Sequence, residues 1–266
     1  MKSVYVANLL TVLLAAVQAG PETRIIGGVK ADMGEWPWQL ALYVGGRFNC
    51  GGSIVAATWG LTAAHCVGSL PSIYQIVAGT NTNNINCTAS NCIVRRLTNA
   101  TRHPNFTAVA PLGYPNDVAY MAWETPIKEG ASGNITVRYA RRATTDHQVG
   151  RNCYISGWGR QYDQGPAAVD LMEARVDVIT KEECKKVWRN MVSDSQVCIR
   201  DSKNFSTGPC DGDSGGPLVC EVSPKNWELV GASSWGVARC NTSYPAVYTR
   251  ISSFNSWLDS QARPKQ

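Results

Sequence analysis

The chain has 266 residues, of which 44% are apolar and 17% are charged. This length supports a large hydrophobic core in one large domain or two smaller ones. The composition, with 24 glycines and 9 tryptophans, argues against disorder and against a coiled coil, and favours a β-rich globular protein. The net charge of +5 is mild and the basic residues form no long cluster, so we do not expect nucleic acid as a partner.

The N-terminus is typical of a secretory signal peptide. Lys2 precedes an apolar run over residues 4–17, and the small residue Ala19 offers a cleavage site. A membrane anchor is the alternative, but the run is short and no second span follows. We therefore expect a signal peptide over residues 1–19, a short segment over 20–24, and a secreted, extracellular protein without membrane attachment.

Short apolar or alternating runs, separated by Gly, Pro, Asn and Ser, follow from residue 25 onward. Such spacing is typical of an all-β sandwich or of barrels. The expected strands cover residues 39–44, 53–56, 73–78, 117–122, 153–158, 171–179, 217–222 and 228–235. Residues 80–116 are rich in Asn and Thr and show no strand pattern after Leu97, which predicts long surface loops.

Two helices are expected. Thr180 and Glu183 form a capping box, which predicts a helix over about residues 181–190. Near the end of the chain, the apolar residues at 251, 254, 257 and 258 fall on one helical face, with Ser252 or Ser253 as the candidate N-cap.

The ten cysteines are too many for a reduced compartment unless they bind metal. Their number is even and no C-x-x-C pair occurs, so disulfides are a better interpretation than a zinc ribbon or a redox dithiol. Spacing alone does not decide which cysteines pair. Six N-x-S/T sequons predict a glycoprotein. The sequons begin at Asn86, Asn99, Asn105, Asn134, Asn204 and Asn241.

A serine between glycines, Ser214 in Gly-Asp-Ser-Gly-Gly-Pro, is the sharpest candidate for chemistry. A serine hydroxyl is a weak nucleophile and needs a base. Among the three histidines, His65 lies directly beside Cys66, whereas the other two lie in polar, loop-like surroundings. Asp117 leads an apolar strand, where a buried carboxylate would need a partner. Taken alone, each residue is better explained as a turn, a structural histidine or a strand cap.

Together with their flanking motifs, these residues resemble the trypsin/chymotrypsin-fold family of serine proteases over nearly all of residues 25–260. Several motifs in the family's order are far more specific than any one of them. The motifs are Ile25–Gly28, Trp36–Gln39, Cys50–Ser53, Leu61–Cys66, Asp117–Ala119, Ser156–Gly159, Gly212–Pro217, Ser233–Gly236 and Pro245–Tyr248.

The resemblance implies an all-β fold of two packed six-stranded antiparallel β-barrels with a short C-terminal helix. The protease domain would cover residues 25–266, with the first barrel over about 25–138 and the second over about 139–266. Ser214 would attack the peptide carbonyl, His65 would carry its proton, and Asp117 would orient the histidine. The backbone amides of Gly212 and Ser214 would form the oxyanion hole.

The resemblance also implies activation by proteolysis. Residues 20–24 would be an activation propeptide, cut after Arg24 by a trypsin-like protease. The new α-amino group of Ile25 would then pair with buried Asp213, a carboxylate that needs a countercharge. The family's disulfide pairings map to Cys50–Cys66, Cys153–Cys220, Cys184–Cys198 and Cys210–Cys240. Cys87 and Cys92 remain and would close a small local loop outside the common pattern.

The specificity pocket implied by the resemblance has Gly208 at its base, where an acidic residue would select Arg or Lys. Pro209 lies beside the base, and the walls carry over to Ser234, Trp235, Gly236 and Ala246. Because the base is neutral, the entrance open and the wall narrowed by one methyl group, we expect cleavage after Phe, Tyr, Leu or Met, with Trp disfavoured. Elastase-like cleavage after small residues is the alternative. We expect no cofactor and no metal, since residues 67–116 contain no carboxylate to bind calcium.

The sequence thus predicts a secreted serine endopeptidase made as a zymogen, with a digestive role. We expect a monomer that acts on protein or peptide substrates and meets protein inhibitors. Two alternatives stay open: a regulatory or defence protease with narrower specificity, and a catalytically silent binding protein that keeps the fold.

Overall fold

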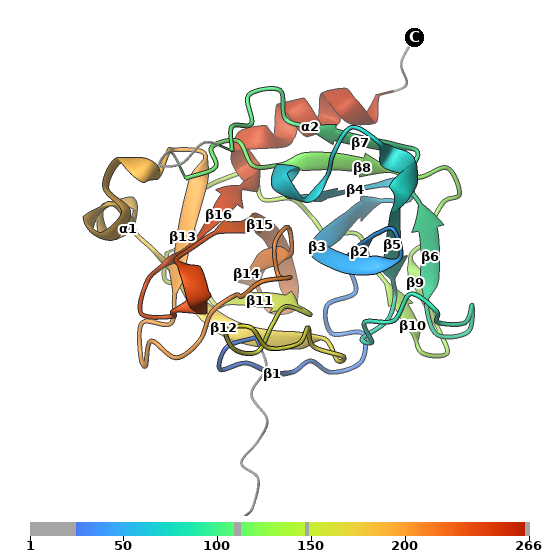
Figure 1. The fold of residues 1–266 in the computed structure, drawn as a ribbon, viewed down its shortest axis with the longest axis horizontal. Helices are drawn as coiled ribbons and strands as arrows, with labels where there is room; N and C mark the ends of the chain where they lie inside the picture. The colour runs from blue at the N-terminus through green and yellow to red at the C-terminus, as the bar shows by residue number, and fades with distance from the viewer. Residues whose placement is uncertain (1–24, 109–112, 147–148, 264–266) are drawn as a thin grey trace, which may run out of the picture.

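A computed structural model of the chain describes residues 25–108, 113–146 and 149–263. Within these residues, two antiparallel β units pack against each other and a short helix follows at the C-terminal end (Figure 1). The fold class expected from the resemblance is therefore confirmed. The predicted signal peptide, the segment 20–24 with Arg24, and His147 lie outside the described residues. None of the described helices is long and apolar enough to cross a membrane.

The first unit is a sheet of seven strands in the order β6-β5-β2-β3-β4-β8-β7. Its strands are β2 (Gln39–Val44), β3 (Arg47–Ala56), β4 (Trp59–Thr62), β5 (Tyr74–Ala78), β6 (Ile93–Arg96), β7 (Asn99–Arg102) and β8 (Ala119–Ala122). Alternation along β2 buries both of its faces. Leu40 and Leu42 belong to the core of this unit. Ala41 and Tyr43 belong to a second core cluster that also includes residues of the second unit, so β2 contributes to both clusters.

The second unit also has seven strands, in the order β1-β12-β11-β14-β15-β16-β13. Six of them close into a ring because β12 pairs with β13 as well as with β11. The bounds are β1 (Val29–Lys30), β11 (Cys153–Gly157), β12 (Met172–Ile179), β13 (Gln196–Arg200), β14 (Pro217–Ser223), β15 (Asn226–Trp235) and β16 (Ala246–Arg250). A separate hairpin consists of β9 (Gly130–Ser132) and β10 (Ile135–Val137).

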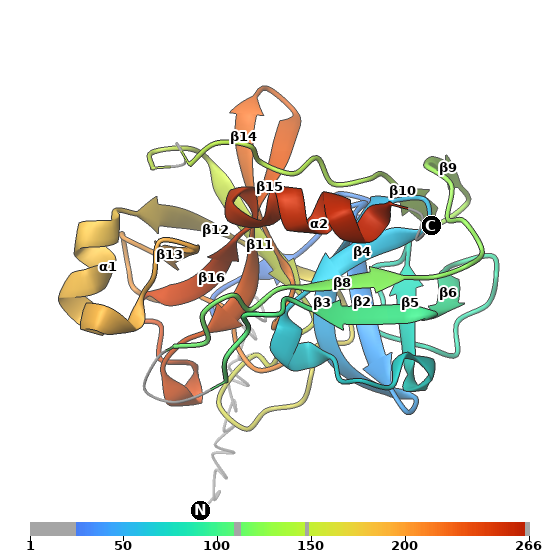
Figure 2. The ribbon, with the colours of Figure 1, turned by 90° about the horizontal axis from the view of Figure 1, so that it is seen from above.

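The segments at the two ends of the described chain each contact the unit formed by the other part of the sequence. β1 precedes the first unit in sequence but pairs with β12 of the second. Helix α2 (Asn255–Ala262) follows β16 and extends towards β4 and β8 of the first unit (Figure 2). The ring of His103, next to β7, contacts the rings of Phe254 and Trp257 at centroid distances of 5.0 and 4.9 Å. These contacts fix the two units relative to each other, and with them the cleft between the units.

Helix α1 (Lys181–Trp188) begins with the expected capping box. The Thr180 hydroxyl accepts from the Glu183 amide, and the Glu183 carboxylate accepts from the Thr180 amide. The N-cap expected for the C-terminal helix is wrong: α2 begins after Phe254, and neither Ser252 nor Ser253 caps it. A 3-10 turn over Ile251–Phe254 takes up these serines instead.

Residues 80–116 are not loops throughout, which corrects the prediction from sequence. β6 and β7 lie in this region, the second of them beyond Leu97. Within the part of the chain that the structure describes, β7 pairs only with β8, from Asn99 opposite Ala122 to Arg102 opposite Ala119. It is held by backbone hydrogen bonds at an edge and buries no side-chain face completely, so its sequence needs no apolar alternation.

Four disulfides are the pairs that the resemblance implies: Cys50–Cys66, Cys153–Cys220, Cys184–Cys198 and Cys210–Cys240. A fifth, Cys87–Cys92, closes the local loop expected from the two remaining cysteines. Of the six sequon asparagines, Asn99 is half-buried within β7 and the others are exposed. The exposed ones are therefore sterically open to a glycan.

Candidate active site

Asp117 lies just before β8, at the junction of the two units, and is fully buried. Its Oδ1 accepts from the His65 backbone amide at 2.9 Å. Its Oδ2 accepts from the Ser234 hydroxyl at 2.6 Å and lies 2.7 Å from His65 Nδ1. The Thr249 hydroxyl donates to the Asp117 carbonyl at 2.7 Å. A buried carboxylate is expensive without donors; Ser234 of β15 supplies one to the Asp117 carboxylate, and Thr249 of β16 holds the Asp117 backbone.

His65 lies in a 3-10 turn over Ala64–Cys66, directly after β4. Cys66 is bonded to Cys50 of β3, so this turn is anchored to the sheet. The His65 side chain is partly exposed, at 25%, on the side away from Asp117. The short contact at Nδ1 directs the Nδ1 proton towards Asp117 and leaves Nε2 free to accept a proton.

Ser214 lies on a tight turn before β14. Gly51 donates to the Ser214 carbonyl at 2.8 Å, and Gly215 donates to Ser233 at 2.7 Å. Gly215 has φ +75°, and a Cβ there would lie 2.0 Å from Thr62 Oγ1. Only glycine fits this position, because it must adopt the left-handed region while touching the first unit.

Ser214 and His65 line one cavity, but no hydrogen bond joins their side chains among the described residues. Such bonds are often long without substrate and shorten when substrate binds. The arrangement therefore holds three groups from distant stretches around one cleft: a hydroxyl, an imidazole and a carboxylate.

Two backbone N–H groups at and beside Ser214 make no hydrogen bond to a protein acceptor among the described residues. Among the described residues, the N–H groups of Gly212 and Ser214 donate to no protein acceptor, whereas that of Asp213, between them, donates to Cys210. Two free donors next to a serine hydroxyl are suited to bind a developing oxyanion.

Asp213 is fully buried beneath the same turn. Its carboxylate accepts from the amides of Gly159 and Cys210 at 2.8 and 2.9 Å. Burial raises the pKa of Asp213 to about 6, although the two amides act in the opposite direction. A carboxylate in this position is stabilised further if a cation reaches it. Ile25 is itself buried, and the next residue, Ile26, pairs with Gly208 in an isolated bridge.

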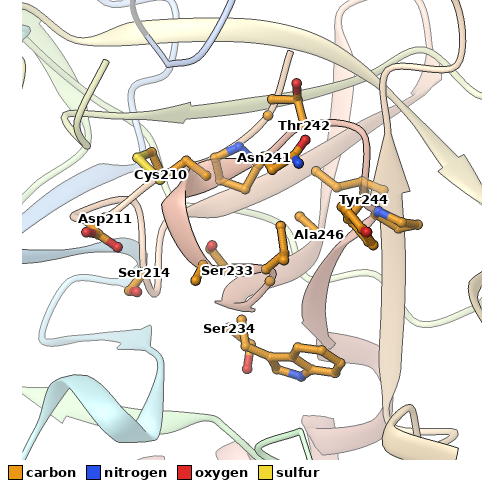
Figure 3. Close-up of a pocket in the computed structure, with 18 of the residues that line it drawn as sticks. Cys210, Asp211, Ser214, Ser233, Ser234, Asn241, Thr242, Tyr244 and Ala246 are labelled. Atoms are coloured by element: carbon orange, nitrogen blue, oxygen red, sulfur yellow. A yellow bond between two sulfur atoms is a disulfide. The ribbon is translucent and has the colours of Figure 1, made fainter. Parts of the chain in front are cut away.

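The cavity has a volume of about 340 Å³ and runs from His65 and Ser214 into the second unit. All six residues expected for the specificity pocket line it: Gly208, Pro209, Ser234, Trp235, Gly236 and Ala246. Figure 3 shows Ser214, Ser233 and Ala246 around this space. A Cβ at Gly236 would have only the Ala246 Cα within 4 Å, at 3.9 Å, so the entrance is open.

Sequence reasoning did not identify several residues of this cavity. Tyr114 lines it and contacts the His65 ring at 5.8 Å; its position three residues before Asp117 is the only sequence signal. Ile199 and Thr242 also line it. Each follows a disulfide-bonded cysteine within two residues, and this proximity is the sequence signal that could have identified them as cavity residues.

Two other features near the site have plain explanations. Cys50, His65 and Cys66 lie close enough together to suggest metal ligands, but the two sulfurs form a disulfide and are unavailable as thiolates. Asp211 lies at the cavity's edge with 73% of its side chain exposed, and Arg160 lies 3.7 Å away. This exposed pair offsets part of the Asp211 charge.

The comparisons with known proteins agree with this geometry. The family model described as Trypsin matches residues 25–258. Human serine protease 56 is 34% identical over 240 residues, which cover 90% of this chain and 38% of that protein. The chain thus spans little more than a third of that relative's length. The solved structure of neuropsin, a serine protease of mouse brain, aligns with a TM-score of 0.77 and 28% identity, over 89% of this chain and 99% of that one.

Proposed function

This chain belongs to the trypsin family of serine proteases, and we propose that it is a secreted endopeptidase made as a zymogen and active through Ser214, His65 and Asp117. The observation that carries the proposal is the buried Asp117 held between His65 Nδ1 at 2.7 Å and Ser234 at 2.6 Å, beside a cavity that contains Ser214. A carboxylate in this place keeps the imidazole in the tautomer that can act as a base.

The reaction proceeds in two steps. Ser214 Oγ attacks the substrate carbonyl carbon while His65 Nε2 takes the hydroxyl proton, and the carbonyl oxygen becomes an oxyanion near the amides of Gly212 and Ser214. His65 then gives the proton to the leaving amine, the peptide C–N bond breaks and an acyl-enzyme remains. Water attacks this ester, with His65 again as the base, and releases the acid and Ser214. Asp117 stays ionised and stabilises the imidazolium.

Activation follows from the burial of Asp213. Cleavage after Arg24 creates an α-amino group on Ile25, which pairs with the Asp213 carboxylate and orders the neighbouring turn and pocket. The bridge between Ile26 and Gly208 supports this coupling, since it ties the new N-terminus to the base of the pocket. An unperturbed α-amino group has a pKa of about 7.7–8.0, so the ion pair weakens in alkaline solution once the amine loses its proton.

Substrate preference follows from a neutral pocket with an open entrance. Gly208 offers no charge for Arg or Lys, and Gly236 leaves room for a large group, so cleavage follows Phe, Tyr, Leu or Met. Protein or peptide chains are the substrates, and a trypsin-like protease is the activator. We propose a digestive role for the activated enzyme.

Cleavage-site profiling tests the proposal. The chain is treated with trypsin, the new N-terminus at Ile25 is verified by sequencing, and a peptide library is digested and analysed by mass spectrometry. We expect cleavage after large apolar residues, and none by an R24Q variant carried through the same treatment. Preference for Arg or Lys would refute the pocket assignment. A correctly cut chain without any peptidase activity would instead favour a silent binding protein.

A further inference from the structure

One residue that borders the pocket is used by no part of the proposed machinery. Ile199, next to last in β13, lines the cavity although only 1% of it is exposed. Ile199 thus belongs to the hydrophobic core and also borders the space where a substrate side chain would sit. It is therefore a candidate for controlling how far that side chain can enter.

The register of β13 with β16 fixes the direction of this side chain. Ile199 lies directly opposite Ala246, and Val197 lies opposite Tyr248. Residues directly opposite in an antiparallel pair point to the same face, with Cβ atoms about 4.5–5.5 Å apart. Since Ala246 forms a wall of the pocket, Ile199 stands next to that wall. Arg200, the next residue, also borders the cavity, and its guanidinium lies over the Phe205 ring at 5.0 Å.

The pocket base does not itself limit the depth. Gly208 has no side chain, and a Cβ there would have only Thr242 within 4 Å, with its Cγ2 at 3.3 Å. The Thr242 hydroxyl is occupied, because it donates to the Phe205 carbonyl. What Thr242 presents towards Gly208 is therefore its methyl group, which makes the base apolar. Ile199 adds apolar surface beside the Ala246 wall.

Building on the proposed function, we propose that Ile199 sets the depth of the primary specificity pocket, so that the enzyme cleaves after Leu and Met in preference to Phe, Tyr and Trp. Ile199 is β-branched, stiff at χ1, and held in a close-packed strand, so it cannot readily move aside. A phenyl ring reaches further from its Cα than a leucine side chain does. A tyrosine hydroxyl would also lose its hydrogen bonds to water at an apolar floor.

Kinetics with matched peptides test this inference. Peptides that differ only at the cleaved residue (Leu, Met, Phe, Tyr or Trp) are digested by the trypsin-activated full chain, with active sites counted by titration with an organophosphonate. We expect kcat/KM for Leu and Met to exceed that for Tyr and Trp by about tenfold or more. In I199A the Tyr/Leu and Phe/Leu ratios should rise by about tenfold or more, and in I199V by less.

V197A is the matched control. Val197 lies on the same strand and face and is 3% exposed, but it is not among the residues that line the cavity. V197A also shortens a buried β-branched side chain on this strand, and it should keep the wild-type ratios of kcat/KM between the peptides. Thermal unfolding shows whether I199A loses stability. If it does, I199V, which keeps the branched Cβ, still shows whether the Tyr/Leu and Phe/Leu ratios rise.

Three outcomes would overturn the inference: ratios unchanged in I199A and I199V, equal shifts in V197A, or a wild-type preference for aromatic or acidic residues. In each of these the titrated enzyme is active, so the proposed peptidase function survives. A trypsin-cut chain that takes up no organophosphonate and cleaves no peptide would overturn both proposals together.

Discussion

The hydrogen bond from Ser234 to Asp117 offers a test of how the site is held together. Replacing Ser234 with alanine removes one hydroxyl and leaves Asp117, which is 0% exposed, with its two contacts to His65. The lost bond, at 2.6 Å, goes to an oxygen that is also 2.7 Å from the imidazole.

The magnitude follows from the charge. A hydrogen bond to a charged group contributes about 1.5–3 kcal/mol, so S234A should lose about that much free energy of unfolding. The bond exists both in the resting enzyme and in the transition state, and only a difference between the two changes the rate. We therefore expect kcat to fall less than about tenfold, equivalent to ~1.4 kcal/mol. Replacing Asp117 with asparagine favours the wrong tautomer and should cost about 10,000-fold.

Urea unfolding and steady-state kinetics on the activated protein measure both quantities. S53A is the matched control, because the Ser53 hydroxyl is buried and has no hydrogen-bond partner among the described residues. Its removal should be nearly neutral. Equal stability losses in S234A and S53A would refute the argument, and so would a loss of kcat in S234A as large as in D117N.

Three further predictions address other parts of the molecule. Burial raises the pKa of Glu173 to about 7, so the folded state holds this proton more tightly than the unfolded chain, and wild-type stability falls as the pH rises from about 4.5 to 7. In E173Q the side-chain oxygen still accepts from the Trp36 indole, which donates to Glu173 at 2.6 Å in the wild type. The free energy of unfolding of E173Q should fall by about 1–3 kcal/mol less than that of the wild type over this pH range. Urea unfolding measures both, and an equal fall in the two proteins would contradict the prediction. G236V places a branched side chain at the pocket entrance and should lower kcat/KM for a phenylalanine peptide by about 100-fold while sparing an alanine peptide, and equal loss on both peptides would show a general defect. D213N should be cut normally before Ile25, as N-terminal sequencing will show, yet titrate few active sites, because burying the new α-amino group without a countercharge costs about 3–5 kcal/mol; full titration would reject the proposed pairing.

The sequence was informative where burial dictates the residue pattern. β2 and β12 coincide with their predicted ranges to within one residue, because a strand buried against the core must carry apolar residues. The capping box of α1 was equally readable, since both of its hydrogen bonds are local. β7 was missed because an edge strand held by backbone hydrogen bonds leaves little mark on side-chain type.

The candidate site shows the same division. Residue types and flanking motifs singled out His65, Asp117 and Ser214. The donors that hold Asp117 could not be inferred in this way, because Ser234 and Thr249 lie 117 and 132 positions away and reach it only once the two units have packed. The position of Ile199 beside the pocket wall likewise depends on the register of two strands.

The central claim is that Ser214 becomes a nucleophile through His65 and Asp117 once the chain is cut. Labelling with an organophosphonate, followed by peptide mapping, tests it most directly. We expect a single adduct on Ser214 after trypsin treatment, almost none on the untreated chain, and a strongly slowed reaction in H65A and D117N. An adduct that persists in S214A, or a cut wild-type chain that takes up no label, would contradict it.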